Sequence, residues 1–204
     1  MIESNIYSLF PTPIYISKIN RKTTNEELFF INKSKQNVNN NEGNTFSVDN
    51  YILNNKIFIN LKEELNLRIK DYFNKIISSN NNITPYITQS WLNFTETNQY
   101  HHKHAHTNSL VSGVFYINCH EEHDKIKFFN DRYQTIKPEV KDYNIWNSET
   151  WWFSVKTGDV ILFPSSLTHM VETKQRENTR ISLAFNVFIK GTIGSDKDLN
   201  QLTL

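Results

Sequence analysis

Cysteine is almost absent from this chain of 204 residues, which contains a single one, Cys119. One cysteine excludes a disulfide within the chain and also a zinc site built from several thiolates. Positive and negative charges nearly cancel, because the chain has 22 Lys and Arg residues and 21 Asp and Glu residues, a formal net charge of +1. That balance, without any basic run, gives no reason to expect nucleic acid or a membrane surface as a partner. We expect Cys119 to be a small buried hydrophobic residue at a strand end.

Long apolar runs are also missing. No segment approaches the length that spans a membrane, and residues 1–10 lack the basic start and apolar stretch of a secretory signal. These absences predict a cytoplasmic protein. Aromatic residues make up 13% of the chain, so much of the core must be aromatic. The length favours a single domain, which we divide into a strand and supporting helices at 1–85, a β core at 86–192 and a tail at 193–204.

Two helices are predicted in the first part of the chain. The segment Thr24-Asn-Glu-Glu27 is a capping box, so a short helix should follow it with Leu28 and Ile31 facing inward. A polar loop rich in asparagine comes next. From Lys56 to Ile77, apolar residues recur every three or four positions, which predicts an amphipathic helix. Its buried face should consist of Leu61, Leu65, Ile69, Tyr72 or Phe73, and Ile76.

Strands dominate the rest of the prediction. Residues 7–17 read as a short strand at a sheet edge, because Pro11 and Pro13 interrupt it. From about Tyr86 the hydrophobic period is two, and turn residues separate the strands. Short strands without intervening helices indicate a mainly β chain with flanking N-terminal helices, built as a double-stranded β-helix (a cupin-like jelly roll). The expected strands are Tyr86–Thr95, Leu110–Cys119, Lys125–Phe129, Thr150–Val155, Asp159–Phe163 and Arg180–Ile189.

Histidines are the most informative residues of this sequence. His104 and His106 are two positions apart, and on a strand such residues point to the same face. His169 follows the segment 158–164, which should bring the chain back to the same end of the barrel. Three imidazoles would then hold one metal ion and leave positions open for substrate or oxygen. The alternative is a solvated histidine-rich loop that binds nothing.

The other four histidines are expected to be exposed. They are His101, His102, His120 and His123, and of these His101 or His102 could line a substrate entrance.

A possible clamp for a carboxylate follows His169. Arg180 and Ser182 lie two apart at the start of the last strand and should face the same side. An arginine fork matches a carboxylate, and a serine adds a hydroxyl. The alternative is an arginine that extends to solvent or pairs with Glu172 or Glu177. Tyr116 has the same parity as His106 if no bulge intervenes, so its hydroxyl could reach the same carboxylate or simply be part of the core.

These residues together resemble a known family, the 2-oxoglutarate (2OG)/Fe(II) oxygenases of marine bacteria and their phages, which are related to the prolyl hydroxylases. The resemblance covers about Leu9 to Gly191. It is carried by Leu9-Phe-Pro-Thr-Pro-Ile-Tyr15, Trp91-Leu-Asn93, His104-Ala-His-Thr-Asn-Ser109, Ser112-Gly-Val-Phe-Tyr116, Gly158-Asp159, Phe163-Pro-Ser165, His169 and Arg180-Ile-Ser-Leu-Ala-Phe-Asn186.

The resemblance implies a role for each of these positions. His104, His106 and His169 would be the metal ligands, and the cofactors would be Fe(II), 2OG and O2. The residues implied to bind 2OG are Arg180, Ser182, Tyr116, Asn93 and Asn186. The protein would be an oxidoreductase of a bacterium, or of a bacterium infected by phage.

One position departs from the family pattern. The usual triad has two histidines and one carboxylate, whereas His106 stands at the middle position here. An imidazole offsets no charge, so the site should bind Fe(II) less tightly and attract the dianionic 2OG more strongly. A metal other than iron is one alternative, and a carboxylate supplied by Asp131 is another.

The implied function is a 2OG- and Fe(II)-dependent hydroxylase that forms succinate and CO2 as coproducts. Its substrate is open, with a peptide or protein side chain as one class, and a homodimer is among the open oligomeric states. Trp91, Trp151, Trp152 and Phe163 are candidates for an apolar wall of the site. Two rival functions remain: a cupin-type metalloenzyme that does not use 2OG, and a jelly-roll module without catalysis that binds or builds structures.

Overall fold

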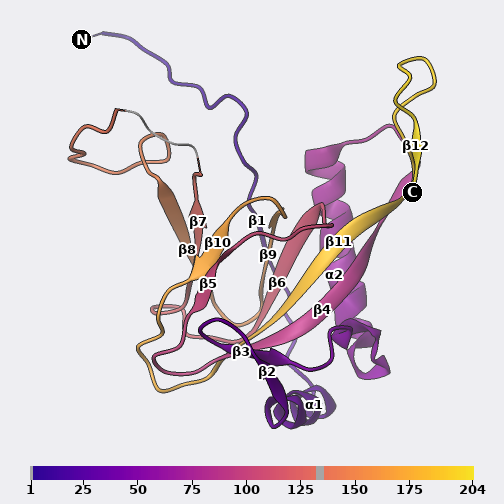
Figure 1. The fold of residues 1–204 in the computed structure, drawn as a ribbon, viewed down its shortest axis with the longest axis vertical. Helices are drawn as coiled ribbons and strands as arrows, with labels where there is room; N and C mark the ends of the chain where they lie inside the picture. Colours follow the sequence, from indigo (N-terminus) through magenta and orange to yellow (C-terminus); the bar gives the residue numbers. More distant parts are fainter. Residues whose placement is uncertain (1, 132–135) are drawn as a thin grey trace.

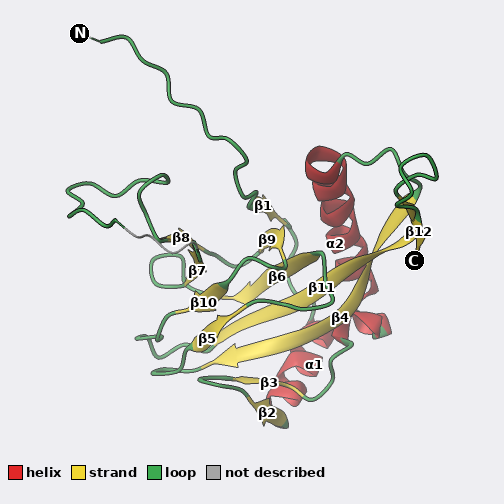
Figure 2. Cartoon of the chain, turned by 45° about the horizontal axis from the view of Figure 1, so that its top comes forward, coloured by secondary structure: helices red, strands yellow, loops and turns green. Residues whose placement is uncertain are grey.

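The computed structural model describes residues 2–131 and 136–204. Its described part is mainly β, with one large and one small antiparallel sheet facing each other and two α-helices beside the large sheet (Figures 1 and 2). Two hydrophobic clusters hold these layers together. One joins the helices to the large sheet, and the other lies between the two sheets, around Tyr116, Phe128 and Phe163.

The N-terminal elements cover the large sheet. Strand β1 (Tyr15–Lys18) pairs only with β9 and so forms an edge, as expected, but residues 7–14 form no strand and bend at Leu9 and Phe10. Helix α1 (Asn25–Lys35) begins at the capping box of Thr24 and Glu27, which confirms that prediction. Ile31 is buried, but Leu28 is 42% exposed, so its predicted inward orientation is wrong. The buried face of this short helix is therefore narrower than the spacing of its apolar residues suggested.

The long predicted helix consists of three pieces. A 3₁₀ turn (Lys56–Phe58) leads into α2 (Ile59–Tyr72), and a π turn (Phe73–Ile77) ends it. The predicted inward residues Leu61, Leu65, Ile69 and Tyr72 are buried. Ile76 is 44% exposed, which corrects its assignment to the buried face. The π turn has more residues per turn than an α-helix, so Ile76 rotates out of the apolar stripe.

The large sheet has the order β1-β9-β6-β11-β4-β3-β2, with β12 added beside β11. All predicted strands of this region are present, with ends shifted by a few residues. Two short strands and a 3₁₀ turn (Ile52–Asn54) occur where loop was expected. The bounds are β2 Val38–Asn40, β3 Thr45–Ser47, β4 Ile83–Thr95, β6 Val111–Asn118, β9 Asp159–Pro164, β11 Arg180–Ile193 and β12 Leu202–Thr203.

The small sheet has the order β5-β10-β7-β8. Strands β7 (Lys125–Phe129) and β8 (Thr150–Ser154) were expected, whereas β5 (His101–His104) and β10 (His169–Val171) were absent from the predicted strands. Both are too short and too polar to show a hydrophobic alternation. Their pairing places His169 directly opposite His104.

Gly113 allows the two central strands to pack closely. A Cβ at this position would lie 2.1 Å from the Phe185 ring, which crosses over Gly113 from the neighbouring strand β11. Any side chain there would displace a ring at the centre of the core. Cys119 follows β6, is partly buried and packs against the cluster between the sheets, as predicted. Among the described residues, no helix is both long and apolar enough to cross a membrane.

Candidate metal centre

Three histidines meet where β5 and β10 pair. The ring centroids of His104 and His169 are 4.3 Å apart, and the ring of His106 lies 5.1 Å from the first and 5.2 Å from the second. One nitrogen from each ring lies within 4.8 Å of the others. Strand β5 ends at His104, so His106 lies just beyond it, held by a hydrogen bond from its backbone N–H to the Ser165 carbonyl (2.9 Å). The structure therefore brings the three predicted ligands together.

Each of the three rings uses its Nδ1 nitrogen to face an oxygen of the protein. The Nδ1 of His104 lies 2.8 Å from the His102 carbonyl, and that of His169 lies 3.1 Å from the Leu167 carbonyl. A carbonyl accepts hydrogen bonds and cannot donate them, so both nitrogens carry the proton. In a neutral imidazole the opposite nitrogen, Nε2, then holds a free lone pair.

A chain of serine hydroxyls assigns the same tautomer to His106. Ser109 can donate only to backbone carbonyls, Ser165 donates to Ser109 (2.7 Å), and Ser112 therefore donates to Ser165 (2.9 Å). This direction leaves the Ser112 oxygen to accept from Nδ1 of His106 (2.8 Å). The Oδ1 atom of Asn186 also accepts from that nitrogen (2.6 Å). Asn186 thus orients a ligand, a contact different from the 2OG contact that the resemblance implied.

The tautomers leave two lone pairs facing each other. The Nε2 atoms of His104 and His106 are 3.1 Å apart, and neither carries a proton to share. Two facing lone pairs repel unless a cation lies between or beside them. These three imidazoles are neutral, and each holds its ring in place through an Nδ1 hydrogen bond to a protein oxygen. Such a donor set suits Fe(II) and other divalent transition metals. The residues therefore fit a metal ion.

Burial keeps these histidines uncharged. Desolvation lowers the pKa of His104 to about 4 and that of His169 to about 3, with repulsion from neighbouring histidines adding to the effect. The pKa of His106 is lowered for the same main reason, although Asn186 opposes the shift. At neutral pH the ligand nitrogens are consequently free of competing protons.

The lowered pKa values predict a pH-dependent stability of the metal-free protein. In the unfolded chain these histidines titrate near their ordinary pKa of about 6.5, so below that pH the unfolded state binds more protons than the folded state. We expect the thermal midpoint of metal-free protein to fall as the pH decreases from about 6.5 toward 4. His169→Ala should reduce this slope, whereas replacing the exposed His123 should not. Equal slopes for wild type and His169→Ala would contradict the burial argument.

Polar groups deeper between the sheets lack partners. Arg180 is 3% exposed, its guanidinium lies 5.2 Å from the centre of the Tyr116 ring, and it donates to the Lys125 carbonyl (3.3 Å). It forms no ion pair with a described residue, so the pairing with Glu172 or Glu177 does not occur. Ser182 lies between Asn93 and Tyr116 in the sheet register.

The unpartnered atoms belong to these same residues. Asn93 Oδ1 and the Tyr116 hydroxyl are buried without a hydrogen bond, and burial raises the pKa of Tyr116. Buried polar atoms without partners cost free energy, which a bound ligand can recover. A cation with a hydroxyl beside it fits a carboxylate, whereas Asn93 Oδ1 is an acceptor and pairs with a donor instead. The residues present therefore fit 2OG.

The remaining predicted residues fall into three places. Trp91 lies 5.7 Å from the His106 ring, and Phe163 packs against His169 at 4.7 Å, so both border the site. Trp151 and Trp152 lie on β8, partly exposed, and do not border it.

Asp131 pairs with Lys103 and Thr168, so it does not supply the third ligand. His120 and His123 are exposed, as predicted.

His101 and His102 both correct the prediction of an exposed side chain, because each is only partly exposed. The burial of His101 is the clearer case. Its ring stacks on His104 with centroids 4.6 Å apart, and burial lowers its pKa to about 2. His101 and His102 line a pocket of about 400 Å³ that also includes His104 and His106. Sequence reasoning missed Asn41 and the serine chain, because their partners lie far away in the sequence. The one available signal was that Ser112 and Tyr116 lie four positions apart, which places both side chains on the same face of a strand.

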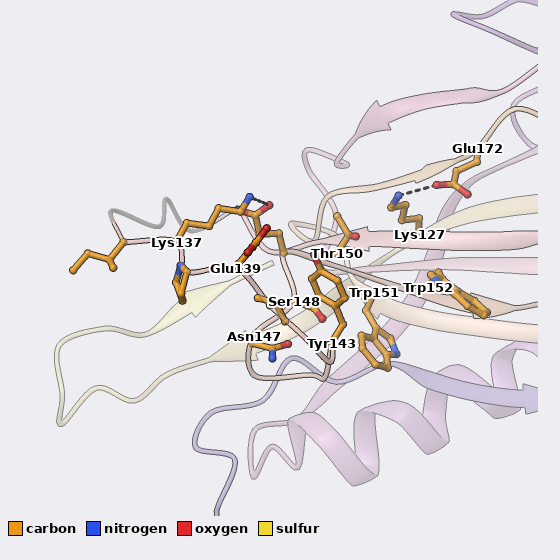
Figure 3. A pocket seen from close by; sticks show the side chains of 14 residues that line it. Lys127, Lys137, Glu139, Tyr143, Asn147, Ser148, Thr150, Trp151, Trp152 and Glu172 are labelled. Atoms are coloured by element: carbon orange, nitrogen blue, oxygen red, sulfur yellow. Dashed lines mark hydrogen bonds and ion pairs between the residues drawn. The ribbon is translucent and has the colours of Figure 1, made fainter.

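A larger groove of about 1210 Å³ lies elsewhere, between β8 and residues 136–149 (Figure 3). Trp151, Trp152 and Tyr143 line it, and the Lys127–Glu172 and Lys137–Glu149 ion pairs account for all of its charged lining residues except Glu139. No histidine is among its lining residues, so this groove does not hold the metal ligands.

Comparison with known proteins agrees with this chemistry. Residues 89–186 match the model of a family described as "Putative 2OG-Fe(II) oxygenase", a segment that spans just under half of the chain and includes His104, His106, His169 and Arg180. Over this segment the chain resembles the 2OG-Fe(II) oxygenases. The family description names 2OG and Fe(II), and HygX structures contain nickel with 2OG or iron. No curated protein sequence matches the chain.

Several solved structures share the fold. HygX from Streptomyces hygroscopicus, with nickel, 2OG and hygromycin B bound, is 12% identical with a TM-score of 0.59, covering 86% of this chain and 82% of that one. SnoN from nogalamycin biosynthesis, in complex with Fe3+, alpha ketoglutarate and nogalamycin RO, is 9% identical with a TM-score of 0.59, covering 88% and 81%. A Burkholderia pseudomallei oxidoreductase of this family is 13% identical with a TM-score of 0.54, covering 80% and 78%.

Proposed function

We propose that this protein is a 2OG- and Fe(II)-dependent oxygenase that hydroxylates a C–H bond of its substrate and releases succinate and CO2 as coproducts. The observation that carries the proposal is the convergence of three unprotonated imidazole nitrogens beside a buried arginine that has no acidic partner among the described residues. In this assignment the two facing sheets form a double-stranded β-helix. Iron and 2OG, when bound, supply the activation of O2 that the side chains themselves cannot provide.

Different side chains bind the metal ion and 2OG. His104, His106 and His169 hold the ion, and their Nδ1 partners fix the direction of each ring. Arg180 and Ser182 bind the distal carboxylate of 2OG, and the unpartnered Tyr116 hydroxyl lies where it can donate to the same group. The Asn93 amide contacts this carboxylate through its Nδ2 donor. The buried aromatic residues around them exclude water and protect the reaction from side products.

The pocket at the histidines is the proposed substrate site. Its lining has no Lys, Arg, Asp or Glu but offers several carboxamides, a threonine and two aromatic rings. These groups suit a neutral substrate with hydrogen-bonding groups. A peptide or protein side chain meets this description and is the substrate class that the sequence resemblance to prolyl hydroxylases implies. HygX and SnoN were solved with hygromycin B and nogalamycin RO, so a small molecule is the second class.

The two rival functions explain fewer of the observations. A metalloenzyme that does not use 2OG needs the three histidines but has no use for Arg180 or for the unpartnered atoms of Tyr116 and Asn93. A binding module without catalysis needs neither group. Burying an arginine without an acidic partner costs free energy, which is understandable where an anionic ligand completes the site.

The test is succinate formation. Purified protein with Fe(II), O2 and 2OG should form succinate slowly without substrate and faster with a true substrate, and candidate peptides and small molecules should be assayed separately. His169→Ala and Arg180→Ala should both lower this basal rate, whereas Arg176→Ala, at an exposed position, should not. If wild-type protein loaded with Fe(II) forms no succinate and 2OG does not perturb its spectrum, the proposal is wrong.

A further inference from the structure

The histidine pocket offers more nitrogen ligands than one triad uses. His101, His102 and His104 form a second group whose ligand nitrogens lie within 4.8 Å of one another. The ring centroids of His102 and His104 are 4.7 Å apart, and those of His101 and His102 are 5.3 Å apart. The ligand nitrogens of this group therefore lie within the same distance of one another as those of His104, His106 and His169.

Hydrogen bonds show which lone pairs this second group presents. The Nδ1 of His102 lies 3.4 Å from the Glu42 carbonyl and carries the proton, so its Nε2 is free. The Nε2 of His101 accepts from the Asn41 amide (3.1 Å). An ion bound here must displace that amide, which makes the second group the weaker of the two.

Access to the two groups differs. His101, His102, His104 and His106 all line the pocket, whereas His169 does not and is 6% exposed. An ion that enters through the pocket thus meets the second group before it can contact His169. His104 belongs to both groups.

The shared histidine can bind only one ion at a time. Its Nδ1 proton is donated to the His102 carbonyl, so a single lone pair, on Nε2, is available. The two groups are therefore alternative positions for one ion and do not form a two-metal centre. The outer position has a ligand held by Asn41, and the inner position has His169 and a ring fixed by Asn186.

We propose that His101, His102 and His104 form a capture position for a divalent transition-metal ion, from which the ion moves to His104, His106 and His169. The inference rests on the proposed ligand triad. Imidazole suits Fe(II), Co(II), Ni(II) and Zn(II) alike, so capture is selective for the class of ion and not for iron. The function of His101 and His102 is to speed metal loading, and they do not contribute to the loaded site.

The first test measures the rate of metal uptake. Metal-free full-length protein is mixed with Co(II) under anaerobic conditions, and the absorption of the bound ion is followed over time. His101→Ala/His102→Ala should take up Co(II) about 10-fold or more slowly, with an equilibrium Kd changed by less than about 3-fold. The matched control, His120→Ala/His123→Ala, removes two exposed histidines outside the pocket and should load like wild type.

The second test detects the outer position directly. His169→Ala should retain weak Co(II) binding through the outer group, and adding His101→Ala/His102→Ala should weaken that binding by a further ~10-fold. His102→Ala alone, at a partly exposed position, repeats both measurements if the double variant folds poorly by circular dichroism.

The outcomes separate the two proposals. Wild-type Co(II) affinity in His169→Ala would refute the triad. A weakened His169→Ala, together with wild-type loading rates in the His101 and His102 variants, would refute the capture position alone.

Discussion

Replacing His169 by alanine is expected to lower the affinity of the protein for Fe(II) by about 100-fold or more, because the loss of a ligand should exceed the effect of removing an outer partner. His169 lies directly opposite His104 and is the least exposed of the three ligands. Its Nε2 has no hydrogen-bond partner among the described residues, so no protein group competes with a metal ion for this nitrogen. Anaerobic titration with Fe(II), followed by analysis of bound metal after desalting, measures this change.

His123→Ala is the matched control for that variant, because His123 is a surface histidine outside the pocket. It should bind Fe(II) as wild type does, which excludes a general effect of losing an imidazole. Retention of wild-type affinity by His169→Ala would remove His169 from the metal site. The metal centre would then have to be sought among His101, His102, His104 and His106.

Replacing Arg180 by alanine should weaken the binding of 2OG by about 100-fold, or ~2.7 kcal/mol, because a buried charge-assisted contact to a carboxylate is lost. Metal binding should be nearly unchanged, since Arg180 does not contact the three ligand rings. The measurement is an anaerobic titration of the Fe(II)-loaded protein with 2OG, followed by its metal-to-ligand charge-transfer absorption. Arg180 has no acidic partner among the described residues, so its removal should not expose an unpaired carboxylate.

Two variants control for this interpretation. Arg176→Ala removes an exposed arginine of the loop before β11 and should bind 2OG normally. Arg180→Lys keeps the charge but loses the planar fork, so its affinity should lie between those of wild type and Arg180→Ala. A wild-type affinity for 2OG in Arg180→Ala would show that the buried guanidinium is structural.

Local signals predicted the elements that local physics controls. The capping box placed the start of α1 because Thr24 and Glu27 satisfy each other's backbone groups within one turn. Alternation of apolar residues placed β6, β7 and β9 within one or two residues. The prediction failed for β5 and β10, because short polar strands have no hydrophobic face to read.

In the candidate site, too, some features follow from local sequence signals and others depend on distant parts of the chain. Spacing alone selected His104, His106 and Arg180 with Ser182, because residues two apart on an extended chain share a side. The inward orientation of Leu28 and Ile76 was wrong, since the neighbours that bury a helix face are not encoded in its own spacing. His101 was misjudged for the same reason: its burial arises from stacking on His104 and from Asn41 on a distant hairpin.

The amino-acid sequence by itself determined the mainly β architecture and selected the residues proposed to hold a divalent metal and a carboxylate. Both follow from side-chain chemistry and short-range periodicity. Tertiary structure alone decided which nitrogen of each ring is free, because the carbonyls, the serine chain and Asn186 that bind the opposite nitrogens come from other turns and strands. It also decided that His101 and His102 share a pocket with the triad, since that proximity depends on pairings between segments far apart in the chain.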